Sequence, residues 1–254
     1  MKLIRALYSI YALGLFFLTC IPTILVYVII YPLPEVPRMR FIYVYNRIWL
    51  ATWGALCGIF IRVRGTAKKD PRQTYVILSN HCNLFDIIMT GSCIQHPFKP
   101  LIKKELLKVP LLGQLLAMTS LPIDRSSHES RAAGFQRMLA EIRRGMSILI
   151  FPEGTRNRTD KPLKEFYDGA FRLAVEAQVP ILPVVLLDIR QLQPVGTFWV
   201  SPGSVSLNFL DPIPTAGKTE ADVEALKQQA FHVMEAYLLA HDRSFSRKPA
   251  AAAA

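Results

Sequence analysis

Hydrophobic and polar positions divide the chain into two parts. From Ala6 to Pro34 no charged residue occurs, and Leu, Ile, Val, Phe and Tyr predominate. About 20 such residues suffice for a helix to cross the hydrocarbon core of a bilayer, so this run predicts a membrane helix, which Pro22 could kink. A second apolar run, from Ile48 to Ile61, is too short to span and fits an interfacial or buried helix. We therefore expect residues 1–64 to form membrane-anchoring helices.

The charges beside the first run do not fit a simple span. Lys2 and Arg5 precede it, and Arg38, Arg40 and Arg47 follow it. Positively charged loops prefer the cytoplasmic side of a membrane, and here both flanks are positive. This favours two helices that dip into a single leaflet, although a one-pass anchor remains open. Either arrangement predicts a membrane-bound protein.

From about Gly65 the pattern changes to short apolar runs that alternate with amphipathic segments. Strands are predicted over Tyr75–Ser79, Phe98–Lys103, Ser120–Asp124, Ser147–Phe151, Ile181–Leu187 and Val205–Leu210. Helices are predicted over Asp86–Gln95, Glu105–Met118, Asp168–Gln178 and Thr219–His241, and from the capping box Ser126-x-x-Glu129 to Gly145. Such alternation predicts an α/β fold with a mixed central sheet flanked by helices, over residues 65–245. Residues 246–254 are expected to be a disordered tail.

Composition and charge narrow the class of protein. Hydrophobic residues make up 51% of the chain and charged residues 19%, which excludes disorder and coiled coil for most of it. The net charge of +11 calls for a negatively charged partner: nucleic acid, an anionic membrane, or a phosphorylated or acidic substrate. The four cysteines are scattered without a C-x-x-C pair, which argues against a disulfide framework and a cysteine-rich zinc site.

The first candidate for chemistry is the segment Asn80–Asp86, at the end of a predicted strand and the start of a predicted helix. Active residues of open α/β sheets gather at such ends. The turn could fold the Asp86 carboxylate onto the His81 ring, leaving the other ring nitrogen free to accept a proton as a general base. A helix-capping His beside a surface Asp is an equally supported alternative. Cys82 is not expected to pair with His81, because neighbours on an extended strand point to opposite faces.

A second candidate, Phe151–Arg158, follows another predicted strand. Gly154 allows a tight turn in which backbone amides can converge, and Arg156 offers a bidentate fork to a phosphate. Glu153 could hold that guanidinium or bond a substrate hydroxyl; the alternative is an ordinary charged loop. Other basic residues near strand ends could complete one anion site, although each alone fits a solvated face: Lys103, Lys104, Lys108 and Arg125.

A third segment, Val179–Val184, is apolar and carries no reactive group. Its two prolines at the start of a strand are typical of an edge strand or a fixed turn, and a role in packing is the better interpretation of the segment.

Together these segments resemble the glycerolipid acyltransferase family, above all its lysophosphatidate acyltransferases. The family's N-H-x4-D block matches Asn80, His81 and Asp86, and its F-P-E-G-T-R block matches Phe151–Arg156. The remaining blocks match at Lys103–Gly113 (K-K-x-L-x-x-x-P-x-x-G), Ile123–Arg125 (I-D-R) and Val179–Val184 (V-P-I-x-P-V). The resemblance covers residues 75–187 in order and spacing, and the N-terminal membrane segment fits it as well.

The resemblance implies transfer of a fatty acyl chain from acyl-CoA or acyl-acyl-carrier-protein to the sn-2 hydroxyl of lysophosphatidate, giving phosphatidic acid. In this family the His is the base and the Asp orients it, roles that fall to His81 and Asp86. Neither a metal nor another cofactor nor a covalent acyl-enzyme is implied. Acceptor binding falls to Glu153, Gly154, Thr155 and Arg156, with phosphate contacts from Arg125 and from Lys103, or Lys104 in its place.

Several alternatives remain. The acceptor could be another lysophospholipid or a lyso-aminolipid. A serine hydrolase is disfavoured because no G-x-S-x-G elbow occurs, and nucleic-acid binding because of the membrane run and the lack of an aromatic and basic ladder. The catalytic domain is expected on the cytoplasmic face of the membrane (the inner membrane in a bacterium), because both acyl donors are made in the cytoplasm.

Overall fold

A seven-stranded sheet organises the computed structural model, which describes residues 2–68, 70, 72–83, 85–94, 96–124 and 127–246. The strands are β1 (Ile59–Arg64), β2 (Val76–Ser79), β3 (Phe98–Lys103), β4 (Leu121–Ile123), β5 (Ser147–Ile150), β6 (Ile181–Leu187) and β7 (Gly203–Phe209). Their order in space is β1-β7-β6-β2-β5-β3-β4. Only the β6–β7 pair among these is antiparallel, so the sheet is mixed, as predicted.

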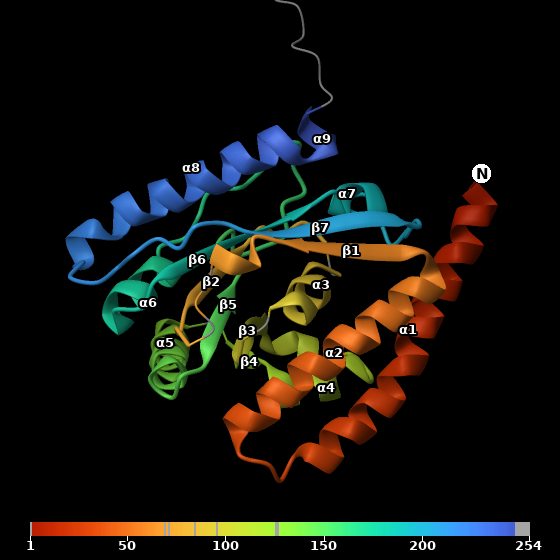
Figure 1. The fold of residues 1–254 in the computed structure, drawn as a ribbon, viewed down its shortest axis with the longest axis horizontal. Helices are drawn as coiled ribbons and strands as arrows, with labels where there is room; N and C mark the ends of the chain where they lie inside the picture. Colours follow the sequence, from red (N-terminus) through yellow and green to blue (C-terminus); the bar gives the residue numbers. More distant parts are fainter. Residues whose placement is uncertain are drawn as a thin grey trace, which may run out of the picture.

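Helices cover both faces of this sheet (Figure 1). One face packs against α1 (Lys2–Ile30), α2 (Glu35–Cys57), α3 (Phe85–Cys93) and α4 (Leu112–Thr119). The other face packs against α5 (His128–Arg143), α6 (Gly169–Ala177) and α8 (Val223–His241). The short helices are α7 (Ile189–Leu192), α9 (Arg243–Ser246) and the 3-10 turns η1 (Thr66–Lys68), η2 (Lys104–Lys108) and η3 (Glu220–Asp222). Two hydrophobic cores therefore sandwich the sheet, which gives the α/β layers that the alternation predicts.

The second apolar run is only partly helical. The helix predicted over Ile48–Ile61 ends at Cys57, because Gly58 takes a left-handed conformation (φ 63°) and caps it. Residues 59–64 then form β1, which pairs in parallel with β7 at the edge of the sheet. The sheet thus begins at Ile59. The helical segment expected over residues 1–64 therefore ends at Cys57, and residues 59–64 belong to the sheet instead.

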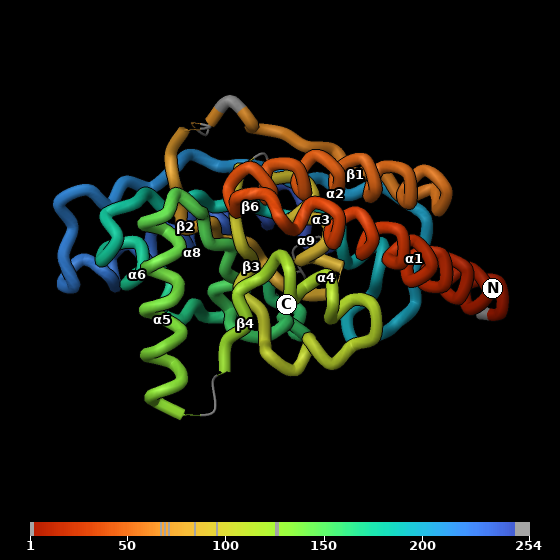
Figure 2. Tube along the Cα trace, turned by 90° about the horizontal axis from the view of Figure 1, so that it is seen from below, coloured from red at the N-terminus to blue at the C-terminus, as the bar shows by residue number. Residues whose placement is uncertain are grey.

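The first two helices form an antiparallel pair that lies along the outside of the α3–α4 layer (Figure 2). One face of α1 is buried against the protein, where the indole Nε1 of Trp53 in α2 donates to the Ala12 carbonyl at 3.1 Å. The opposite face exposes large apolar side chains: Leu3, Ile4, Leu7, Ile10, Leu18, Ile21, Leu25 and Ile29. By length and composition α1 could also cross a membrane. The folded chain therefore keeps an exposed apolar surface along α1.

Strand β6 lies inside the sheet, which agrees with the packing role predicted for Val179–Val184 and excludes the alternative of an edge strand. All its residues are buried, between β7 and β2. Pro183 falls between the last ladder pair of β6 with β7 (Val184 with Phe209) and the isolated Ile181–Ile213 bridge. The partner chain leaves the ladder there, so the missing proline N–H forfeits no ladder bond.

Other boundaries also differ from the predictions, three of them for a physical reason or in the part of the chain described. The helix predicted over Glu105–Met118 is divided into η2 and α4, with Pro110 between them. Helix α5 is capped by Ser127, whose Oγ accepts from the Ser130 N–H at 3.1 Å; Ser126 lies outside the described residues. Of the predicted tail, Ser246 ends α9, and residues 247–254 lie outside the described residues as well.

Candidate active site

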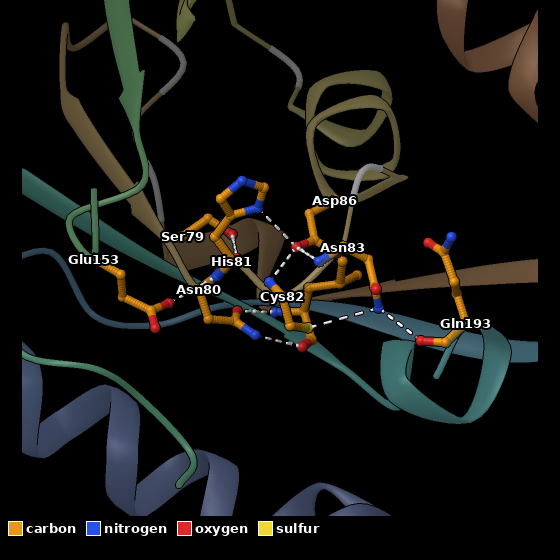
Figure 3. A network of polar contacts seen from close by, with 9 residues as sticks. Ser79, Asn80, His81, Cys82, Asn83, Asp86, Glu153 and Gln193 are labelled. Atoms are coloured by element: carbon orange, nitrogen blue, oxygen red, sulfur yellow. Dashed lines mark hydrogen bonds and ion pairs between the residues drawn. The ribbon is translucent and has the colours of Figure 1, made fainter. Parts of the chain in front are cut away.

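The candidate site forms where β2 ends and α3 begins. Asp86 in the first turn of α3 accepts a hydrogen bond on Oδ2 from the His81 ring, with Nδ1 at 2.9 Å (Figure 3). The same oxygen accepts the N–H groups of Cys82 at 2.5 Å and Asn83 at 2.7 Å. The Asp86 side chain is 0% exposed. The predicted fold-back of this carboxylate is therefore present, and the alternative with a surface Asp is wrong.

Two side chains hold the His81 ring, and two hydrogen bonds hold the His81 backbone. Asp86 bonds its Nδ1, and the Phe151 ring stacks on it with centroids 4.3 Å apart and planes 24° from parallel. The His81 backbone N–H donates to Glu153 Oε1 at 2.8 Å, and its carbonyl accepts from the Asn157 N–H at 2.6 Å. The side chain is 20% exposed, and the second ring nitrogen points away from Asp86 in Figure 3. That nitrogen remains available to a molecule in the adjoining cleft.

Glu153 has a different place from the one expected. It is 1% exposed, and both its oxygens accept backbone N–H groups: Oε1 from His81, and Oε2 from Lys164 at 2.9 Å. Burial raises the pKa of Glu153 to about 7, although the N–H groups of Lys164 and His81 oppose the rise. Both oxygens of Glu153 are thus engaged within the protein, and its part in acceptor binding stays a prediction. Its carboxyl fastens the His81 turn to the segment around Lys164.

Two buried amides fix the same turn from the other side. Asn80 continues the β2–β6 pairing with its side chain, donating to the Leu186 carbonyl at 2.9 Å and accepting from the Leu186 N–H at 2.8 Å. Asn83 donates to the Gln193 carbonyl at 2.8 Å. The sequence motif contains Asn80 but gives no sign of this role, because the partner strand is distant in the chain. The turn is thus anchored to β6 and to the segment after α7.

A cleft of about 410 Å³ opens beside His81. Its polar rim carries Lys103, Arg156 and Arg158 together with Gly154 and Thr155. Its apolar lining consists of Ile87, Leu101, Ile102, Leu106 and Phe151. A cleft lined by both cationic and apolar side chains suits an amphiphile with an anionic head.

The structure separates the basic candidates. Lys104 pairs with Asp124, whereas Lys103 lines the cleft, so the choice between them falls to Lys103. Arg125 lies outside the described residues. Arg158 also lines the cleft but was assigned no role in the sequence. Its signal was the alternation Arg156-x-Arg158, which can place two arginines on one side of an extended loop.

The F-P-E-G-T-R loop turns as expected but does not present its amides to an anion. Gly154 takes φ +68°, which is the left-handed region that favours glycine. The Gly154 N–H donates to the Phe151 carbonyl and the Thr155 N–H to the Glu153 carbonyl, while Thr155 Oγ1 accepts from Lys164 Nζ at 2.8 Å. The N–H groups of Gly154 and Thr155 are therefore engaged within the loop, and the side chains of Arg156 and Arg158 are the cations that this segment places at the cleft.

Cys82 is buried, and burial raises the pKa of its thiol well above the ordinary value, with the Asp86 charge adding to the rise. A thiolate nucleophile is therefore disfavoured at this position.

The fold and this His–Asp site define an acyltransferase. Residues 60–187 match the family model described as Acyltransferase, and the chain belongs to that family. It is 32% identical over 186 residues to human 1-acyl-sn-glycerol-3-phosphate acyltransferase alpha, covering 70% of this chain and 64% of that protein. It is 33% identical over 198 residues to the 1-acyl-sn-glycerol-3-phosphate acyltransferase of Limnanthes douglasii, covering 75% and 67%. The chain thus spans about two thirds of the length of these relatives.

A solved structure supports the same fold. The crystal structure of the 1-acyl-sn-glycerophosphate (LPA) acyltransferase PlsC from Thermotoga maritima matches with a TM-score of 0.76 over 93% of this chain and 94% of that one, at 20% identity. The apolar α1 and the kinship to these acyltransferases indicate an association with membranes.

Proposed function

We propose that the protein transfers a fatty acyl chain from an acyl thioester to the sn-2 hydroxyl of lysophosphatidate, and so forms phosphatidic acid. One observation carries the proposal: a His81–Asp86 pair opens onto a cleft with a cationic rim and an apolar lining. The names of the human and plant relatives point to the same acceptor. A phosphate monoester suits the rim better than the head of a lyso-aminolipid, which carries no such anion.

The reaction follows from the two nitrogens of the His81 ring. Asp86 accepts a hydrogen bond from Nδ1–H, which keeps the proton on Nδ1. Nε2 therefore carries the lone pair, and this lone pair accepts a hydrogen bond from the acceptor hydroxyl. As the hydroxyl oxygen attacks the thioester carbonyl, its proton moves to Nε2, and the buried Asp86 stabilises the imidazolium. The tetrahedral intermediate then collapses, the C–S bond breaks, and the thiolate takes the proton from Nε2. The products are an ester and a free thiol, without an acyl-enzyme.

In this proposal the residues that line the cleft take the remaining roles. Lys103, Arg156 and Arg158 hold the acceptor phosphate, and Gly154 and Thr155 shape the wall beside it. The donor is acyl-CoA or acyl-acyl-carrier-protein, and no further cofactor enters this scheme. Glu153, Asn80 and Asn83 act through the backbone of the turn and keep the His81 ring in place.

We further propose that α1 and α2 lie in the plane of one leaflet, with the catalytic domain on the cytoplasmic face. Contacts of α1 with the rest of the chain run from Ser9, which bonds Val200, to Tyr27, which bonds Asn46 in α2. A perpendicular span would detach much of this interface. An in-plane helix keeps it and still places the opposite, apolar face in the acyl chains.

The experiment is thiol release from palmitoyl-CoA by the detergent-purified protein, with and without lysophosphatidate. We expect release to require the acceptor, to yield phosphatidic acid, and to fall about 10²–10⁴-fold in His81→Ala, the range for loss of a general base. His232→Ala, at an exposed position on α8, is the matched control and should keep full activity. Release without acceptor would indicate a thioesterase, and near-normal turnover in His81→Ala would exclude the mechanism. Acyl-acyl-carrier-protein and a panel of lysolipids identify the donor and the acceptor.

A further inference from the structure

A short loop between α7 and β7, residues 194–199, holds two aromatic side chains in solvent. Phe198 is 77% exposed and Trp199 is 45% exposed. Neither belongs to the cleft beside His81. Large aromatic side chains in solvent on neighbouring positions signal a binding surface more often than isolated apolar residues do.

The loop is a fixed structure, so the exposure is built in. The Thr197 N–H donates to the Pro194 carbonyl at 3.2 Å and closes a turn, and Gly196 takes φ +77° at the position that requires it. The buried Gln193 side chain donates to the Thr197 carbonyl at 3.0 Å. The turn therefore presents Phe198 outward from a defined backbone.

The loop is seated on the amino-terminal part of α1. Val200 is fully buried, its N–H donates to Ser9 Oγ at 2.9 Å, and the Ser9 hydroxyl lies 3.3 Å from the Val200 carbonyl. The Gly203 N–H donates to the carbonyl of Gly58, at the end of α2. The aromatic pair thus lies beside the end of the helix pair whose outer face exposes Leu3, Ile4 and Leu7. Figure 1 shows the chain after α7 reaching toward the N-terminal end of α1.

We propose that residues 194–199 are a second membrane-contacting element, which enters the same leaflet as α1 and α2. The occupant of this surface is a phospholipid bilayer, because the loop is hydrogen-bonded to the amino-terminal part of α1, whose outer face is apolar and exposed, and because Trp and other aromatic side chains favour the level of the lipid head groups. This inference rests on the membrane docking in the proposed function.

The loop is also tied to the active site. Gln193, directly before it, accepts the Asn83 side chain at its carbonyl, and Asn83 donates its own N–H to Asp86 (Figure 3). Lipid contact at Phe198 therefore sets the position of the catalytic turn relative to the bilayer surface. An acceptor embedded in the bilayer benefits from that position, whereas an acceptor dissolved in water does not.

The first test places a fluorophore at the loop. The four native cysteines are buried, so labelling addresses an introduced Cys at Phe198→Cys, at Leu18→Cys on the exposed face of α1, or at Val233→Cys on α8. Each labelled full-length protein is reconstituted into phosphatidylcholine–phosphatidylglycerol vesicles with nitroxide-bearing lipids. We expect quenching at positions 18 and 198 and none at 233. Quenching at 18 without quenching at 198 would overturn this inference alone, and quenching at neither would overturn the membrane docking with it.

The second test measures turnover. The double variant Phe198→Ser, Trp199→Ser should raise the KM for long-chain lysophosphatidate in vesicles about tenfold or more, since one aromatic side chain in lipid is worth at least a factor of ten. The KM for a short-chain, monomeric lysophosphatidate should not change. The control Val233→Ser, Leu239→Ser removes exposed apolar side chains from α8 and should leave both values unaltered. An equal loss with both acceptors, or no loss with either, would overturn the inference.

Discussion

Glu153 shows how a single buried carboxyl ties the candidate site to pH. Its oxygens accept the N–H groups of His81 and Lys164, and burial raises its pKa from 4.5 to about 7. Between these two values the folded chain keeps a proton that the unfolded chain has lost. The contribution of Glu153 to the free energy of unfolding is therefore fully present below about pH 4.5, and it is lost as the pH rises through 7.

The variant Glu153→Gln removes this titration. We expect the free energy of unfolding of the parent protein, relative to the variant, to fall as the pH rises from 4.5 to about 7, by roughly 3 kcal/mol in all. Thermal unfolding in detergent at a series of pH values measures it. Glu165→Gln, at an exposed position nearby, should show no such trend. A difference between Glu153→Gln and the parent that is constant with pH would contradict the assignment.

Arg158 lines the cleft, and under the proposed function it helps to hold the acceptor phosphate. We expect Arg158→Ala to raise the KM for lysophosphatidate about 10–100-fold, because a charge-assisted hydrogen bond to phosphate contributes roughly 1.5–3 kcal/mol. Arg158→Lys should recover part of the loss, since it restores the charge without the guanidinium fork. Steady-state kinetics at varied acceptor concentration give the values. The exposed Arg144→Ala, directly after α5, is the control, and an unchanged KM in Arg158→Ala would remove Arg158 from the site.

At the scale of the elements, local signals and long-range pairing were predicted with different success. The bounds of β3 and β6 agree with the apolar runs, because each is a short run with clear limits. The place of β6 inside the sheet could not be read from its prolines, since it depends on where β7 leaves the ladder. The segment Ile59–Arg64 alternates with the period of a strand, because Phe60, Arg62 and Arg64 are exposed and the residues between them are not. It continues the apolar run of α2 without a polar break, however, and only the Gly58 cap separates α2 from β1.

The candidate site shows the same difference between local contacts, which the sequence indicates, and long-range contacts, which it does not. The His81–Asp86 contact follows from a spacing within one turn, so the sequence predicted it as one of two alternatives, and the burial of Asp86 excludes the other. The structural role of Glu153 depends on its hydrogen bond with the Lys164 N–H, and this bond forms only when the chain is folded.

A buried lysine joins three elements. Lys99 in β3 lies 2.6 Å from Glu35 Oε1 at the start of α2 and 3.0 Å from Glu141 Oε2 in α5, and its side chain is only 11% exposed. Lys99→Met would leave Glu35 and Glu141 with only their longer ion pairs, to Arg38 at 3.9 Å and to Arg144 at 3.8 Å. We expect a loss of about 3 kcal/mol in the free energy of unfolding and faster proteolysis at residues 31–34 between α1 and α2, because removing one partner of a buried ion pair is strongly destabilising.

Denaturant titration and limited proteolysis test this linkage. Lys104→Met breaks the more exposed pair with Asp124 and is the matched control, expected to cost at most about 1 kcal/mol. Loss of stability without faster cleavage at residues 31–34 would show that Lys99 supports the core but does not hold the helix pair.

At the scale of the whole molecule, the placement of α1 decides how substrates reach the site. An in-plane helix pair keeps both ends of α1 on the side of the membrane that carries the catalytic domain. A one-pass span would put those ends on opposite sides. The bonds of Ser9 to Val200 and of Tyr27 to Asn46 favour the first arrangement, because both persist only while α1 lies along the folded chain. Lysophosphatidate could then enter the cleft from the leaflet in which it resides.

Three introduced cysteines distinguish the two arrangements: Leu3→Cys and Leu33→Cys near the two ends of α1, and Leu239→Cys on α8 as the marker for the catalytic domain. A membrane-impermeant maleimide is added to sealed vesicles of known orientation, and the buried native cysteines stay unlabelled. We expect all three positions to react from the same side, with slower reaction at 3 and 33 because they lie close to lipid. Reaction of positions 3 and 33 from opposite sides would establish a span, and α1 would then have to leave Val200 whenever the enzyme is in the membrane.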